Sequence, residues 1–130
     1  MWPSARAAYN EQVDEKQPAT VDVWAERDAR RAGAQHSAVT EVEQALPRAV
    51  EILRAHGCTE IWLAGSFAQG APRASSDVDL LVRDLPGARR GEAVDALEHL
   101  FHRPVDLAEL ERIPMERLSL ALCGARRLFP

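Results

Sequence analysis

Two short apolar runs near the middle of the sequence carry polar residues that a buried strand would ordinarily exclude. The first run, residues 61–64, ends in Gly65 and Ser66, and the second holds Asp77 and Asp79 on either side of a valine. Residues two apart on a strand project from the same face, so these two carboxylates are predicted to project together. Two such charges repel unless a cation lies between them, and Mg²⁺ is a common cation for carboxylate oxygens beside a phosphate.

The turn after the first run has the residues of a phosphate site. Gly65 has no Cβ and lets the backbone approach a ligand closely, while the N–H and hydroxyl of Ser66 can face a phosphate. Arg73 stands in the loop predicted over residues 71–76. It is either a contact to phosphate or a solvated loop residue.

A third carboxylate, Asp106, stands between a valine and a leucine further along the chain. An Asp-X-Asp pattern alone is common on solvated strand edges and in loops. Polar residues within three apolar runs are harder to explain as ordinary surface charge, because a charge in an apolar strand costs stability unless it is paired or coordinated. A hydrolase nucleophile at Ser66 is the weaker alternative, since no histidine or lysine base has a motif position beside it.

The spacing of these residues resembles a known family. Gly65-Ser66, followed after ten residues by Asp77-Val78-Asp79, is similar to the signature of the nucleotidyltransferase superfamily that includes polymerase β, and especially of its minimal, single-domain bacterial members. The similarity extends from about Ala45 to Phe129, and Asp106 stands where that family has its third carboxylate. The resemblance implies an α/β fold with a small mixed sheet covered by helices, like the polymerase β palm.

Phosphoryl transfer requires in-line positioning of an acceptor hydroxyl and neutralisation of phosphate charge. We therefore expect Asp77 and Asp79 to hold two Mg²⁺ ions, one of them along the triphosphate of ATP. Asp106 would complete the shell of the other ion and help to draw the proton from the acceptor. Gly65 and Ser66 would hold the β- and γ-phosphates. Many relatives have arginine where Gln69 stands, which weakens the inference of phosphate binding at that position.

The acceptor is left open by the residues themselves. Several minimal members of the resembled family are antitoxins that transfer AMP from ATP to a tyrosine of a HEPN-domain toxin, so the resemblance implies such a toxin as partner. One alternative is transfer to a small hydroxylated molecule, with an oligomer completing the pocket. Another is a non-catalytic module that neutralises a toxin by contact alone.

Composition narrows the remaining possibilities. A chain of 130 residues is long enough to bury a core without disulfides, and Cys58 and Cys123 lack the spacing of a metal site. A formal charge of −4 argues against an extensive nucleic-acid surface. No apolar run approaches the roughly 20 residues of a membrane span, and the first residues lack the pattern of a signal peptide, so we expect a cytoplasmic protein.

The remaining pattern predicts the order of the elements. Residues 1–20 are expected to form a loosely ordered tail, and residues 21–130 a single nucleotidyltransferase domain with N-terminal helices. Helical spacing and its stop signals predict helices over residues 21–34, 37–56, 92–102 and 113–124. Strands are predicted over residues 61–64, around 77–82, over 105–107 and, as a short closing strand, at 128–129.

Three details of this prediction can be tested directly. Gly33 is expected to end the first helix, and Pro47 to kink or split the second. In the last helix, the spacing predicts a buried stripe made of Met115, Leu118 and Leu122.

Overall fold

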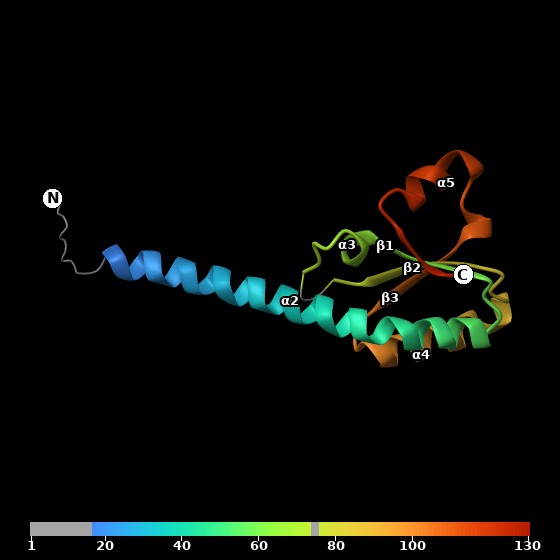
Figure 1. Ribbon diagram of the computed structural model, residues 1–130, viewed down its shortest axis with the longest axis horizontal. Helices are drawn as coiled ribbons and strands as arrows, with labels where there is room; N and C mark the ends of the chain where they lie inside the picture. Colours follow the sequence, from blue (N-terminus) through green and yellow to red (C-terminus); the bar gives the residue numbers. More distant parts are fainter. Residues whose placement is uncertain (1–16, 74–75) are drawn as a thin grey trace. The chain divides into compact units, whose positions relative to one another are not determined.

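A computed structural model of the chain describes residues 17–73 and 76–130. The chain divides after Ala34 into two units, and the second unit, Gln35–Pro130, contains the whole sheet. In chain order the elements are α2 (Gln17–Ala55), β1 (Glu60–Ala64), α3 (Gly65–Ala68), β2 (Val78–Arg83), the 3₁₀ helix η1 (Gly87–Arg89), α4 (Arg90–Phe101), β3 (Val105–Glu109), the 3₁₀ helix η2 (Leu110–Arg112), α5 (Met115–Leu122) and β4 (Arg126–Phe129) (Figure 1).

The four strands form one sheet in the order β3-β2-β1-β4. Strand β1 is antiparallel to both β2 and β4, whereas β2 and β3 are parallel. The parallel pair needs a crossover connection, and α4 supplies it. The predicted fold class, a small mixed sheet with helices against it, is confirmed.

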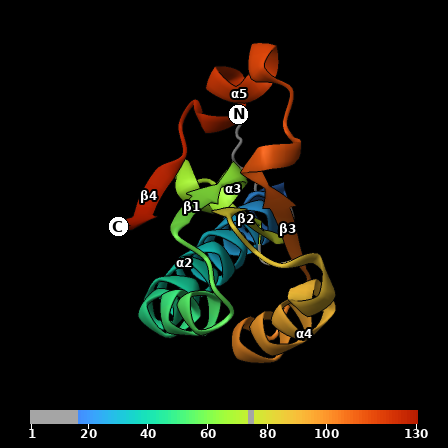
Figure 2. The same ribbon diagram turned by 90° about the vertical axis from the view of Figure 1, so that its right-hand side faces the viewer.

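The two faces of the sheet differ in chemistry because side chains alternate along each strand. One face carries the apolar side chains and packs against α4 and residues 35–55 of α2, whereas α5 lies on the opposite side of the sheet (Figure 2). Burying each leucine or isoleucine of such a core contributes about 1.5–3 kcal/mol. The buried strand residues on the helix-covered face are Ile61, Leu63, Val78, Leu80, Val82, Val105 and Leu107.

The long helix α2 differs from the prediction. It runs without interruption from Gln17 to Ala55, so Gly33 does not end a helix and Pro47 does not split one. A glycine within a helix costs only about 1 kcal/mol relative to alanine, too little to end it where the flanking residues favour a helix. At Pro47 the helix continues because core contacts on both sides, at Leu46 and Ala49, hold it together. The predicted end of the second helix at residue 56 is confirmed to within one residue, because α2 ends at Ala55 and Gly57 follows with a positive φ of 105°.

The predicted buried stripe of α5 is wrong. Met115 is 86% exposed, Leu118 and Leu122 are only half-buried, and no residue of α5 is fully buried. Periodicity shows which side chains share a face of a helix, but burial also needs an apolar surface opposite that face. The sheet face on this side carries Asp79 and Asp106 among its side chains, so it offers less apolar surface to cover.

The other predicted elements are present with shifted ends. Strands β1, β2, β3 and β4 lie where strands are expected, and α4 begins two residues before its predicted start. Of the predicted tail, residues 1–16 lie outside the described residues, and residues 17–20 belong to α2. The expectation of one domain over residues 21–130 stays a prediction. Among the described helices, none combines the length and the apolar character required to cross a lipid bilayer.

Candidate active site

The Gly-Ser turn directly follows β1. Gly65 has a φ of +69°, a left-handed conformation that favours glycine, and it begins the short helix α3. A Cβ at this position would overlap Oδ2 of Asp79 and lie 3.0 Å from its Cγ. The absent side chain of Gly65 therefore lets the turn and the second carboxylate of the Asp-X-Asp pattern touch.

The strand register aligns the turn with the third carboxylate as well. Ala64 is the partner of Asp79 across the antiparallel pair β1 and β2, and Asp79 is the partner of Asp106 across the parallel pair β2 and β3. Neighbouring strands lie about 4.8 Å apart, so the end of β1 and the two aspartates form one row across the sheet. Asp77 comes just before β2 and is exposed, whereas Asp79 is half-buried.

This row is electrostatically unfavourable for Asp79. Partial burial raises the pKa of the Asp79 carboxyl above its usual range, and the negative charges of Asp106 and Asp77 raise it further. A bound cation would favour the charged form of all three carboxylates. The site therefore has the electrostatic character of a place for positive charge.

The donor chemistry of the three aspartates fits Mg²⁺, which prefers carboxylate oxygens. Across residues 17–73 and 76–130, no three His, Cys, Asp or Glu side chains are grouped closely enough to hold a metal ion as they stand. Asp77 and Asp106 are exposed, so their side chains can change rotamer without breaking the core.

Arg73 is hydrogen-bonded to Ser76 just before the Asp-X-Asp pattern. The Arg73 N–H donates to Ser76 Oγ at 2.7 Å, and the Ser76 N–H donates back to the Arg73 carbonyl at 3.0 Å. Arg73 is exposed, and Ser66, the other predicted phosphate contact, is half-buried. The carbonyl of Ser66 accepts the N–H of Ala71 at 3.0 Å, which closes the turn after α3.

The side chain of Gln69, just after α3, faces a different part of the chain. A Cβ added at Gly124 would lie 3.5 Å from Nε2 of Gln69, so this amide packs against the turn between α5 and β4. Gly124 has a φ of +76°. Gln69 therefore joins the end of α3 to the segment that leads into β4.

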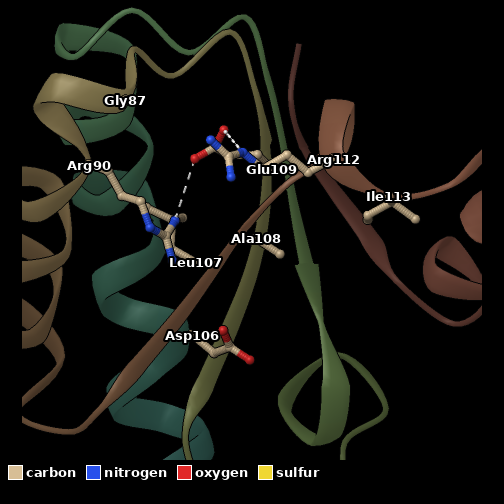
Figure 3. Close-up of a pocket in the computed structure, with 8 residues that line it drawn as sticks. All are labelled: Gly87, Arg90, Asp106, Leu107, Ala108, Glu109, Arg112 and Ile113. Carbon is tan, nitrogen blue, oxygen red and sulfur yellow. Dashed lines mark hydrogen bonds and ion pairs between the residues drawn. The ribbon is translucent and has the colours of Figure 1, made fainter.

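A pocket opens beside Asp106 along the edge strand β3. Its volume is about 480 Å³, and Figure 3 shows the side chains of Arg90 and Arg112 directed toward Glu109, with Asp106 further along the strand. Arg112 Nε donates to Glu109 Oε1 at 3.2 Å, and Arg90 Nη1 lies 3.8 Å from Glu109 Oε2. The pocket is lined by Gly87, Arg90, Asp106, Leu107, Ala108, Glu109, Arg112 and Ile113.

Sequence reasoning gave no role to Arg103 or to Glu109, and both lie near the predicted site. Arg103 Nη1 donates to the carbonyl of Ser76, the residue before Asp77, at 3.2 Å. Glu109 is the shared partner of two arginines from α4 and η2. The contacts of Arg103 with Ser76 and of Arg90 with Glu109 join segments far apart in the sequence, so no local pattern marks them. Only the pair of Glu109 and Arg112, three residues apart, is local.

The fold is a palm-like α/β fold with a mixed sheet. Its polar groups lie at one end of that sheet, where the glycine turn contacts a carboxylate and the aspartates form a row. The chain belongs to the nucleotidyltransferase domain family, because the model of that family matches residues 46–123, more than half of the chain. The matched range contains Gly65, Ser66 and all three aspartates. No curated protein matches the chain in a sequence search.

Several solved structures share the fold. A minimal nucleotidyltransferase is 24% identical with a TM-score of 0.63, over 69% of this chain and 95% of that chain. A toxin-antitoxin with AMP-PNP is 24% identical with a TM-score of 0.58, over 65% of this chain and 72% of that chain. A third is the tri-AMPylated HEPN toxin of Shewanella oneidensis in complex with an MNT antitoxin, at 20% identity and a TM-score of 0.53, over 67% of this chain and 71% of that chain.

Proposed function

We propose that this chain transfers AMP from ATP to a tyrosine hydroxyl of a HEPN toxin, for which it is the cytoplasmic antitoxin. The observation that carries the proposal is the contact between the Gly65 backbone and the Asp79 carboxylate, with Asp106 beside Asp79 on the next strand. A turn that can bind phosphate therefore lies beside carboxylates that can bind a divalent cation. Nucleotidyl transfer needs both together.

In this proposal Gly65 and Ser66 hold the β- and γ-phosphates, and Arg73 contacts phosphate from the loop before Asp77. Asp77 and Asp79 hold two Mg²⁺ ions, and Asp106 completes the shell of one of them. When bound, these ions neutralise phosphate charge and acidify the acceptor hydroxyl. The exposed positions of Arg73, Asp77 and Asp106 leave their side chains accessible to such ligands.

The reaction forms one bond and breaks one. The acceptor oxygen bonds to the α-phosphorus of ATP, and the bond from that phosphorus to the oxygen bridging to the β-phosphate breaks, so pyrophosphate leaves. Asp106 takes the proton of the acceptor hydroxyl and passes it to solvent. The pocket of about 480 Å³ that Asp106 lines is the proposed approach of the acceptor to this carboxylate.

The proposed acceptor is inferred from the partners of proteins with a similar fold. Solved structures of similar fold include a HEPN toxin carrying AMP in complex with an MNT antitoxin, which supports a protein acceptor. The pocket volume also lies within the range of small-molecule sites, roughly 300–1,000 Å³, and this favours a small hydroxylated molecule as the second candidate.

The position of the label on ATP gives a direct test. Incubated with Mg²⁺, a HEPN toxin and ATP labelled at the α-phosphate, the chain should place label on the toxin. ATP labelled at the γ-phosphate should leave the toxin unlabelled, because that phosphate departs in pyrophosphate. In a second incubation, with a cell extract in place of the toxin, label on a small molecule would support the second candidate. Inhibition of the toxin without any label on it would indicate a non-catalytic antitoxin.

A matched pair of variants tests the site in the same assay. Asp79→Asn should lower the transfer rate by about a hundredfold or more, because losing a metal ligand costs several kcal/mol in the transition state and each 1.36 kcal/mol is tenfold in rate. Asp95→Asn removes an equal charge from the exposed side of α4 and should leave the rate unchanged. Equal rates for Asp79→Asn and wild type would contradict the proposed site.

A further inference from the structure

Arg103 lies between α4 and β3, and its side chain is only 11% exposed. The side chains of Arg48 and Arg112, by comparison, are 64% and 79% exposed. A charged group is costly to bury unless neighbouring groups bond to it. The contacts of this guanidinium therefore indicate what it holds in place.

Arg103 contacts described residues in three separate segments of the second unit. Arg103 Nη1 donates to the Ser76 carbonyl at 3.2 Å, and its guanidinium carbon lies 5.2 Å from the centre of the Phe67 ring. On the side toward α2, Nη2 lies 3.8 Å from Oε1 of Glu41, which is itself 70% exposed. An ion pair with an exposed partner contributes little, so the hydrogen bond to Ser76 and the contact with the Phe67 ring matter more than the pair with Glu41.

Each of these two partners adjoins a residue of the proposed site. Phe67 follows Ser66 in α3, and Ser76 precedes Asp77. Arg103 itself precedes Asp106 by three residues, and the carbonyl of the intervening Pro104 accepts the N–H of Val78 at 3.0 Å. One buried side chain thus joins the phosphate turn, the loop that carries Asp77 and the segment that leads to Asp106.

We propose that Arg103 is a positioning residue for nucleotidyl transfer, which sets the spacing between the Gly-Ser turn and the Asp-X-Asp segment without touching substrate. This inference rests on the proposed function. The turn and the aspartates come from different segments, so their spacing must be fixed by contacts between them. Small errors in such a spacing are costly, because a displacement of about 1 Å can lower a rate by about a hundredfold.

The contact geometry requires arginine and not only positive charge. A guanidinium is planar, so one face can lie on the Phe67 ring while its edge donates to a carbonyl. A lysine ammonium is a compact charge and cannot stack on the ring in this way. Arg103→Lys therefore keeps the charge and removes the planar contact, which separates positioning from a simple electrostatic effect on phosphate.

The first measurement does not depend on activity. In the free protein, Arg103→Lys should accelerate hydrogen exchange at the Ser76 and Val78 amides by about tenfold relative to wild type, because no planar group then stacks on the Phe67 ring while donating to the Ser76 carbonyl. The control Arg48→Lys, on the exposed face of α2, should leave these amides unchanged. Unchanged exchange in Arg103→Lys would overturn the proposal, whatever the activity.

The second measurement concerns the reaction. Arg103→Lys should lower kcat by about ten- to a hundredfold while changing KM for ATP by less than about threefold, because phosphate contacts remain and only the geometry of attack is lost. Added guanidinium ion should partly restore kcat to Arg103→Ala, whereas methylammonium should not. A normal kcat in Arg103→Lys overturns the inference, and a wild-type chain without any transfer overturns the proposed function itself before variants are compared.

Discussion

Gly65 and Gly70 share a left-handed backbone but differ in their surroundings. Their φ values are +69° and +74°, so a side chain would be strained at either position by about 1–2 kcal/mol. A Cβ at Gly70 would meet nothing within 4 Å, whereas a Cβ at Gly65 would overlap the Asp79 carboxylate. The pair therefore separates the cost of the conformation from the cost of the close approach.

We expect Gly70→Ala to lower the free energy of unfolding only by the cost of the strained backbone conformation. Gly65→Ala should lower the free energy of unfolding by the same conformational cost and by about 1–3 kcal/mol more, because the Asp79 side chain must be displaced. It should also abolish nucleotide transfer. Urea unfolding of both variants measures the difference. If the two variants lose equal stability and both remain active, the contact between Gly65 and Asp79 has no role in the site.

At the scale of the element, α2 contains a residue that ought to weaken it. Pro47 has no N–H to donate, and its ring crowds the carbonyl of Glu43 one turn earlier. It is exposed and makes no part of the core, although its neighbours Leu46 and Ala49 are buried. The helix therefore forms against a local penalty that packing offsets.

Replacing this proline should stabilise the protein. Pro47→Ala restores a helix hydrogen bond and removes the clash, so the free energy of unfolding should rise by about 1–3 kcal/mol, as the cost of a proline within a helix suggests. Thermal unfolding measures this change, and Arg48→Ala, at the next exposed position, serves as control. A fall in stability would mean that a bend at Pro47 is needed to seat Val42 or Leu46 in the core.

The same elements show what the sequence could and could not predict. The strands and the order of the helices follow from alternation and spacing, which are local properties. The breaks predicted within α2 are wrong for two reasons. A glycine at position 33 costs too little to end the helix, and core packing on either side of Pro47 offsets the proline. The exposure of Met115 could not be foreseen, because it depends on what the sheet presents to α5.

The candidate site divides in a similar way. The Gly-Ser turn and the aspartates can be found from residue types and spacing, and the alignment of Asp79 with Asp106 follows once β2 and β3 are paired in parallel. The contacts of Arg103 with Phe67 and Ser76 join three segments and have no local signal. Long-range side-chain contacts of this kind require the folded chain.

At the scale of the whole molecule, the two faces of the sheet affect stability in opposite directions. The face against α4 and residues 35–55 of α2 is apolar and stabilises the fold by burial. The other face holds Asp79 and Asp106 in adjacent strands, and their mutual repulsion lowers stability when no cation is bound. Stability of the metal-free protein should therefore depend on pH through the carboxyl of Asp79.

The sign of that dependence follows from the raised pKa of Asp79. The folded protein keeps the Asp79 proton to a higher pH than the unfolded chain does, so the free energy of unfolding falls as pH rises from the usual carboxyl range through the raised value. Asp106→Asn removes one of the charges that raise this pKa, and the fall should become shallower. Below that range the Asp79 contribution is fully present in both proteins.

Melting curves of the wild type, Asp106→Asn and Asp95→Asn test this at near-neutral pH. Without metal, Asp106→Asn should melt about 3–5 °C above wild type, the shift that roughly 1 kcal/mol produces in a chain of this size, while Asp95→Asn on the exposed side of α4 should not. With Mg·ATP at a hundredfold excess over Kd, wild type should gain roughly 2.7 kcal/mol, since ligand binding to the folded state alone stabilises it. Asp106→Asn should gain much less, so the order of the two proteins reverses. If Asp106→Asn is less stable than wild type without metal and gains as much from Mg·ATP, Asp106 is a structural residue and not the third carboxylate of the site.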